Sequence, residues 1–206
     1  MTAIAAALAE IDEANAADPT LHDGAPLAQL QGQLAERWVL VLDPSASDAL
    51  RLAARAHHLR RWAVPRAAYP EGRPGYLKWR RDQKIRHARE LGELLGAAGV
   101  DAPTVERAQA IVTKVGLGLD PEVQCFEDAV CLTFLDTQLE QIAARLERAH
   151  MIDVIGKTLK KMSKEGKALA ATVTLSSNAA DLVAAAVNAL AVETSSLTEH
   201  SSGEQV

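Results

Sequence analysis

Residues 120–146 read DPEVQCFEDAVCLTFLDTQLEQIAARL, and this stretch decides the fold class. Asp120 can cap a helix, and Pro121 suits the first helical turn. The apolar residues that follow recur at spacings of three and four, which is the period of one helix face. This apolar stripe consists of Cys125, Leu132, Leu135, Leu139, Ile142 and Leu146. We therefore expect one long helix over residues 121–149, with the stripe facing a core.

The same period recurs along the rest of the chain, with no βαβ alternation. Asp-Pro pairs and glycines mark the helix ends, and three prolines and two glycines make residues 65–75 an irregular connection. The sequence predicts an all-α fold, with a single helical domain over residues 1–170. An Ala-rich C-terminal helix within residues 171–193 and a disordered tail over residues 194–206 should follow it. The other expected helices cover residues 3–17, 27–42, about 47–62, 76–98, 103–114 and 151–161.

Composition limits the classes of function. The 206 residues carry a formal net charge of -5, so we expect no nucleic-acid partner unless a local basic patch supplies one. No apolar stretch is long enough to span a bilayer, and the N-terminus lacks the features of a signal peptide. Cys125 and Cys131 lie six positions apart on one helix and cannot pair with each other. We expect a cytoplasmic protein with reduced thiols and no membrane contact.

Two carboxylates occur where the long helix should be buried. Asp128 lies within the apolar stripe, and Glu127 lies on the neighbouring stripe. Burying an ionised carboxylate costs several kcal/mol unless a cation, a metal or a hydrogen-bond donor compensates it. A structural ion pair with an arginine and a catalytic or metal-binding role are both consistent with this pattern.

Histidines and arginines concentrate between residues 57 and 87. His87 lies where the polar half of one helix face, with Tyr76, Arg80 and Lys84, meets its apolar half. Such a helix either lines a polar cavity or has a solvated end. The periodicity does not show whether His57 or His58 points inward. The cationic and aromatic residues around the 65–75 connection are Arg60, Arg61, Arg66, Arg73, Arg80, Arg81, Trp62, Tyr69, Tyr76 and Trp79. They predict either an anion site or a surface covered by arginine side chains.

Several blocks of the sequence, in order, resemble the domain of unknown function 4202 family over about residues 11–170. The blocks are Ala53–Trp62, Pro65-Arg66, Tyr69-Pro70, Gly75–Arg80, His87-Ala88, Asp120–Gln124, Glu127-Asp128, Cys131-Leu132, Phe134-Leu135, Lys157-Thr158 and Lys161–Ser163. More distantly, His58, His87 and the acidic pair are similar to the HD-type metal-dependent phosphohydrolases. That resemblance implies a helical bundle in which a divalent metal activates water against a phosphorus centre.

These features predict a metal-dependent hydrolase of a phosphorylated or anionic small molecule. Its cofactor would be a divalent metal held by His58, His87 and Asp128, with Glu127 or Asp128 as the catalytic base. The substrate would be bound by Arg61, Arg66, Tyr76, Arg80 and Lys84. The alternative is a non-catalytic helical binding or scaffold protein that recognises an anionic metabolite, RNA or a protein partner. The oligomeric state stays open, with a homo-oligomer among its possibilities.

Overall fold

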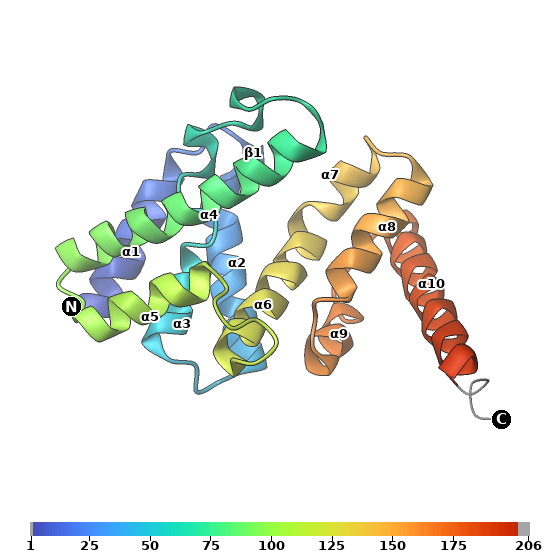
Figure 1. The fold of residues 1–206 in the computed structure, drawn as a ribbon. Coiled ribbons are helices and arrows are strands. Elements are labelled where there is room, and N and C mark those ends of the chain that lie inside the picture. The colour runs from blue at the N-terminus through green and yellow to red at the C-terminus, as the bar shows by residue number, and fades with distance from the viewer. Residues whose placement is uncertain (1, 202–206) are drawn as a thin grey trace. The chain divides into compact units, whose positions relative to one another are not determined.

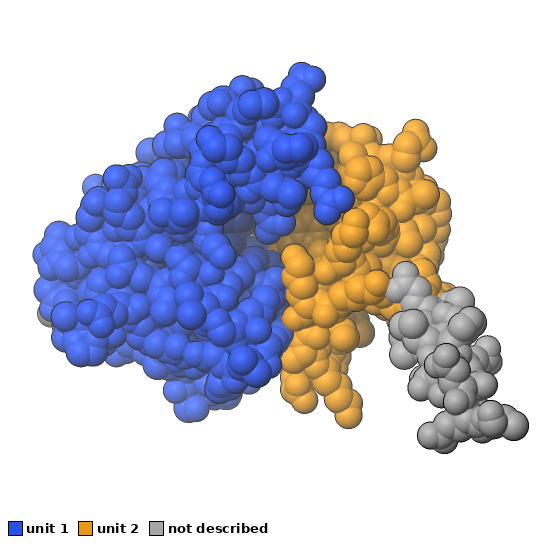
Figure 2. All heavy atoms as spheres, viewed as in Figure 1, with its two compact units in different colours: residues 1–133 blue, residues 134–206 orange. Residues whose placement is uncertain are grey.

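A computed structural model describes residues 2–201, with side chains described as far as residue 191. Helices dominate this part of the chain, which confirms the all-α prediction (Figure 1). The chain divides into two compact units, residues 1–133 and 134–206, coloured separately in Figure 2. The division falls inside one helix, at residue 133. None of the described helices combines the length and apolar character needed to cross a bilayer.

The first unit contains five helices and most of a sixth among its described residues. They are α1 (Ala3–Ala16), α2 (Leu27–Leu42), α3 (Asp48–Arg55), α4 (Gly72–Ala97), α5 (Ala102–Val112) and α6 (Pro121–Thr137). Two short 3-10 helices, η1 (Arg61–Ala63) and η2 (Arg66–Ala68), lie between α3 and α4. Side-chain caps begin α3 and α5, where Ser47 accepts from the Leu50 N–H and Asp101 accepts from the Thr104 N–H, each at 3.1 Å.

The connection between α1 and α2 contains a minimal hairpin. Strand β1 (Leu21–His22) pairs antiparallel with β2 (Ala25–Pro26). The two residues between them, Asp23 and Gly24, have φ angles of 50° and 82°. Positive φ at both positions is the requirement of a two-residue turn whose twist matches that of the strands, and Asp-Gly is a favoured pair there.

The core of the first unit forms around α3, which packs against α1, α2 and α5. Fully buried side chains come from each helix, and each contributes on the order of 1.5–3 kcal/mol when removed from water. They include Ile11, Leu50, Leu52, Leu91, Leu95, Ile111 and Phe126. The last residues of α3, among them Ala53 and Ala54, belong to this core. The candidate site begins in the turn that follows α3.

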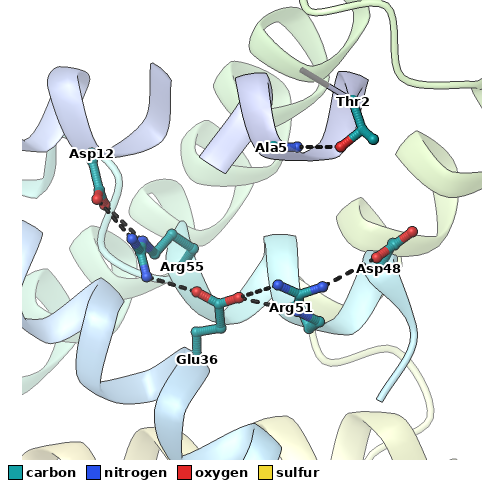
Figure 3. Close-up of polar contacts among 7 residues, drawn as sticks. All are labelled: Thr2, Ala5, Asp12, Glu36, Asp48, Arg51 and Arg55. Carbon is teal, nitrogen blue, oxygen red and sulfur yellow. Dashed lines mark hydrogen bonds and ion pairs between the residues drawn. The ribbon is translucent and has the colours of Figure 1, made fainter. Parts of the chain in front are cut away.

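Beside the core, an ion-pair network joins α1, α2 and α3 (Figure 3). The Arg55 guanidinium donates to both carboxylate oxygens of Asp12 at 2.7 Å and to Glu36 at 2.6 Å. Glu36, which is buried, also accepts from Arg51 at 2.9 Å. Arg51 in turn reaches Asp48 at 3.4 Å. The network therefore satisfies a buried carboxylate and fixes the three helices relative to one another.

The second unit consists of the end of α6 and four further helices. They are α7 (Leu139–Ala143), α8 (Arg148–Leu159), α9 (Lys164–Ala170) and α10 (Ser177–Ser201). Helix α8 packs against α10, and α7 contacts both. The buried side chains of these two long helices are Met151, Ile155 and Leu159 from α8 and Ala179, Leu182 and Ala186 from α10.

Some helix boundaries were predicted wrongly. The helix expected to reach residue 62 ends at Arg55, and Arg60 in the following turn adopts a left-handed conformation with φ of 48°. The helix expected over residues 121–149 breaks at Gln138, whose backbone is not helical, and again before Arg148. Helix α10 is described as far as Ser201. Residues 202–206 lie outside the described residues.

Candidate anion-binding site

Three histidines from two segments lie together in the first unit. His57 and His58 occupy the turn after α3, and His87 lies in the middle of α4. The rings of His57 and His58 are 4.1 Å apart between centroids, and those of His58 and His87 are 6.4 Å apart. His57 and His87 are buried and His58 is half-buried, so both imidazoles left undecided by the periodicity belong to the cluster.

The same nitrogen of each ring is held by an oxygen. Nδ1 of His57 lies 3.0 Å from the carbonyl oxygen of Ala54, and Nδ1 of His58 lies 2.6 Å from Oε1 of Gln31. These oxygens only accept, so each Nδ1 carries the proton. His87 bonds to the backbone of His57. Because Nε2 of His87 has no partner, Nδ1 makes that bond as well. In their neutral form the three imidazoles therefore carry a lone pair on Nε2.

Burial keeps these imidazoles neutral. It is the largest cause that lowers the pKa of His57 to about 4, with Lys114 and Arg61 adding to the effect. Burial, followed by Arg86 and Arg61, lowers the pKa of His87 to about 3. The pKa of His58 is also held well below its ordinary value, first by burial and then by His57. Removing a charged group from water disfavours the protonated form of histidine.

Nε2 of His87 is a polar atom left unsatisfied inside the protein. The His87 residue is only 3% exposed, and this nitrogen has no hydrogen-bond partner. Most buried polar side-chain atoms in folded proteins have a partner, so an exception requires an explanation. One explanation is a bound group that supplies the missing contact.

Arg61 is charged, close enough to His87 to lower its pKa, and has no counter-charge among the described residues. Its guanidinium stacks on the Trp79 ring, 4.4 Å from the centroid. Among the residues that the structure describes, no carboxylate pairs with it, and burial followed by Arg80 lowers its pKa to about 10. Even at that value the group is charged at neutral pH. Arg80 in turn lies over Tyr76, 5.8 Å from the ring centroid. The cluster thus presents positive charge that no acid balances.

Helix α4 fixes the segment that carries Arg61. Gln83 donates to the carbonyl oxygens of Arg61 at 3.1 Å and of Val64 at 2.7 Å. Arg86 donates to the carbonyl oxygen of Arg60 at 2.9 Å, and Trp79 donates to that of Val64 at 2.9 Å. These bonds satisfy backbone groups that the end of α3 leaves unpaired. Arg61 is therefore presented by a braced turn rather than by a free loop.

The two acids of α6 are buried as predicted, at 3% exposed for Glu127 and 2% for Asp128. Glu127 forms an ion pair with Lys114, and Asp128 accepts a hydrogen bond from Gln124 at 3.0 Å. A lysine therefore supplies a compensating cation for Glu127. Lys114 has a φ of 57°, and it also lies near the Phe126 ring.

A family model described as a domain of unknown function, DUF4202, matches residues 5–183. The chain belongs to the DUF4202 family. A search of curated proteins and a search of solved structures each gave no match. Two of the sequence blocks that carry the DUF4202 resemblance, Ala53–Trp62 and Gly75–Arg80, supply His57, His58 and Arg61 on one side and Tyr76 and Arg80 on the other.

The structure of this DUF4202 chain brings together only some of the residues expected to bind substrate. Arg61, Arg80 and Tyr76 lie near one another. Arg66 instead donates to the backbone carbonyls of Tyr69, Pro70 and Gly72. Its guanidinium therefore stabilises its own loop. Lys84 is exposed on α4.

The acids and histidines of the DUF4202 chain do not form a metal centre on their own. Among the described residues, no group of three or more histidine, cysteine, aspartate or glutamate side chains is arranged to hold a metal ion. Glu127 is neutralised by Lys114, and the charges nearest the imidazoles are those of Lys114, Arg61 and Arg86. Cations repel a metal ion and attract an anion. The set of residues present therefore fits an anion better than a metal.

A neighbouring cavity has the opposite charge. It has a volume of about 660 Å³, and Arg60 and Trp62 line it together with Glu10, Glu13, Glu90 and Glu93. Four carboxylates around one cavity repel an anion. The lining of this cavity therefore does not suit an anion.

Proposed function

We propose that this protein binds a phosphate-bearing or other anionic small molecule at the histidine–arginine site, which comprises His57, His58, His87, Arg61 and Arg80. The observation that carries the proposal is the pairing of two unsatisfied groups. Arg61 has no carboxylate partner among the described residues, and the buried Nε2 of His87 has no hydrogen-bond partner.

A phosphate monoester suits both groups. Its charged oxygens can accept two parallel bonds from a guanidinium, which is the geometry that favours arginine over lysine at phosphate sites. A protonated phosphate oxygen can donate to a neutral imidazole nitrogen. Partial burial strengthens both contacts, because the local dielectric constant is lower than that of water.

Replacing Arg61 with methionine should weaken binding of phosphate and simple phosphate monoesters by roughly 10- to 150-fold, the equivalent of about 1.5–3 kcal/mol for a lost charged hydrogen-bond pair. Isothermal titration calorimetry with inorganic phosphate and a panel of monoesters measures this. Arg89→Met is the matched control, since Arg89 lies on the same region of α4 but is exposed and makes only long ion pairs of 3.8 and 3.9 Å. Binding that is equal in wild-type protein and Arg61→Met would contradict the proposal.

A metal-dependent hydrolase of the same ligand class is the second candidate, and one observation favours it. All three imidazoles are anchored through Nδ1, which leaves Nε2 to face outward from the anchor. Histidines that bind metals commonly donate their other ring nitrogen to a carbonyl or carboxylate oxygen in this way. Asp128 or an oxygen of the anionic substrate would have to complete the ligand set.

Metal analysis separates the two candidates. If the hydrolase reading holds, protein purified without a histidine tag should contain stoichiometric divalent metal or gain stability when metal is added. A hundredfold excess of metal over Kd corresponds to about 2.7 kcal/mol. His87→Ala should remove that gain in a thermal melt, while His150→Ala, at an exposed histidine, should keep it. If the protein contains no metal and zinc, manganese or magnesium does not raise its stability, the hydrolase candidate is excluded and the binding function remains.

A further inference from the structure

The basic residues of this acidic protein are strongly concentrated. Residues 60–89 contain ten arginines and lysines but only two acids, Glu71 and Asp82, although the whole chain carries a formal net charge of -5. Eight of the ten are arginines. A patch of one sign on a protein of the opposite net charge creates a local field that attracts a partner to that face alone.

The N-terminal half of α4 carries the exposed part of this charge. Arg73, Arg80 and Lys84 are exposed, and no carboxylate pairs with any of them in the described part of the chain. They are seven and four positions apart, so they follow one side of the helix over about 16 Å. Lys78 and Arg81 share the single carboxylate of Asp82. We call Arg73, Lys78, Arg80, Arg81 and Lys84 the α4 cationic face.

Aromatic rings accompany these cations. Tyr76 is 42% exposed and has Arg80 over its ring, and Lys78 lies over the ring of Tyr69 at 5.3 Å from the centroid. An exposed aromatic ring beside guanidinium groups offers a stacking surface for an unpaired base, while the cations contact the phosphates.

We propose that the α4 cationic face binds single-stranded nucleic acid. Because the net charge of the chain is negative, a nucleic-acid partner needs a local basic patch, and this face supplies one. An anionic membrane fits the face less well, because Leu77 and Ile85 are the exposed aliphatic side chains of α4, and a helix that lies in a membrane interface needs a continuous apolar face. The predominance of arginine over lysine favours bidentate phosphate contacts over a diffuse attraction to an acidic protein. This proposal does not depend on the small-molecule function.

Fluorescence anisotropy with a labelled, mixed-sequence 20-nucleotide RNA tests the proposal with the full-length chain. With three to four phosphate contacts, affinity should fall by roughly 20- to 50-fold between 50 and 200 mM salt. The double variant Arg73→Glu/Lys84→Glu should bind at least about tenfold more weakly, because two attractive contacts become repulsive. Lys164→Glu/Lys167→Glu changes two exposed lysines of α9 and makes the same change in net charge, so it serves as the matched control.

The two double variants decide the outcome. Weaker RNA binding in the α4 variant alone, with inorganic phosphate binding unchanged, supports the α4 cationic face as a nucleic-acid surface. An equal loss in both variants would show a net-charge effect and overturn the proposal. It is also overturned if wild-type protein does not bind the RNA at 50 mM salt, or if it binds only vesicles that contain anionic lipid.

Discussion

Acidification from pH 7.5 to pH 4.5 should remove much of the stability of this protein, and the loss should begin near pH 6.5, above the range in which ordinary carboxylates become protonated. The cause is the cluster of His57, His58 and His87, which folding keeps neutral. Burial lowers the pKa of His57 from 6.5 to about 4 and that of His87 from 6.5 to about 3. Below pH 6.5 these histidines therefore become protonated in the unfolded chain while they stay neutral in the folded chain.

The sign of the effect follows from this difference in proton uptake. Stability from the neutral histidines is fully present above about pH 6.5 and is lost as the pH falls toward the pKa values of the folded state. One proton taken up only by the unfolded state lowers the free energy of unfolding by about 1.4 kcal/mol per pH unit. For His57 alone the loss down to pH 4 is on the order of 3 kcal/mol, a large share of the 5–15 kcal/mol typical of a domain.

Urea denaturation at pH 7.5, 6.5, 5.5 and 4.5 measures this loss. His57→Gln should reduce the slope of the unfolding free energy against pH by the equivalent of about one proton, because a buried amide does not titrate. His150→Gln is the control, since that histidine is exposed and its replacement should leave the slope unchanged. Asp120, whose hydrogen bonds from Arg107 lower its pKa to about 2, loses its contribution only between its ordinary pKa and pH 2. An unfolding free energy that stays constant between pH 6.5 and 4.5 would refute neutral buried histidines.

The helices could be predicted from the sequence where local signals act alone. Helix α2 begins and ends at the residues expected, because the Asp43-Pro44 pair stops it locally. The end of α3 could not be predicted in this way. The turn at Arg60 is held by Arg86 and Gln83, which reach its carbonyl groups from more than 20 positions away. No local pattern reports a contact between segments so far apart.

The candidate site was predictable in part for the same reason. The apolar stripe of α6 predicted a buried Asp128, and burial is confirmed. The partner of Glu127 could not be predicted, because Lys114 reaches it from the end of another helix through a left-handed residue. Arg66 was expected to bind substrate, yet its guanidinium caps the carbonyls of its own loop. A sequence shows which segment is rich in charged residues, but it does not show which of these side chains are occupied by hydrogen bonds to backbone carbonyls.

Removing Arg55 should destabilise the first unit by about 1.5–3 kcal/mol, because Asp12 and Glu36 lose charged hydrogen bonds. Each acid keeps another donor, since Gln33 donates to Asp12 at 3.0 Å and Arg51 donates to Glu36 at 2.9 Å. Its guanidinium links Asp12 of α1 to Glu36 of α2 through contacts of 2.6–2.7 Å (Figure 3). In Arg55→Met the apolar side chain keeps much of the volume but supplies no donor. Glu36 would retain Arg51 as its partner, whereas Asp12 would lose both of its contacts with Arg55. The midpoint of urea denaturation at pH 7.5 should therefore fall sharply with little change in the denaturant slope.

The double variant Arg55→Met/Asp12→Leu tests whether the loss comes from unpaired charge or from lost packing. Replacing both partners by apolar residues also removes the Asp12 carboxylate, which loses its ion pair in Arg55→Met. Part of the stability should therefore return if the charge is responsible. Arg89→Met should change the free energy of unfolding by less than about 0.5 kcal/mol, since its ion pairs are long and exposed. If Arg55→Met lies within 1 kcal/mol of the wild type on the scale expected for surface ion pairs, the network does not hold α1 to α2 and α3. In that case the apolar contacts of Ile11 and Leu52 would have to fix these helices without it.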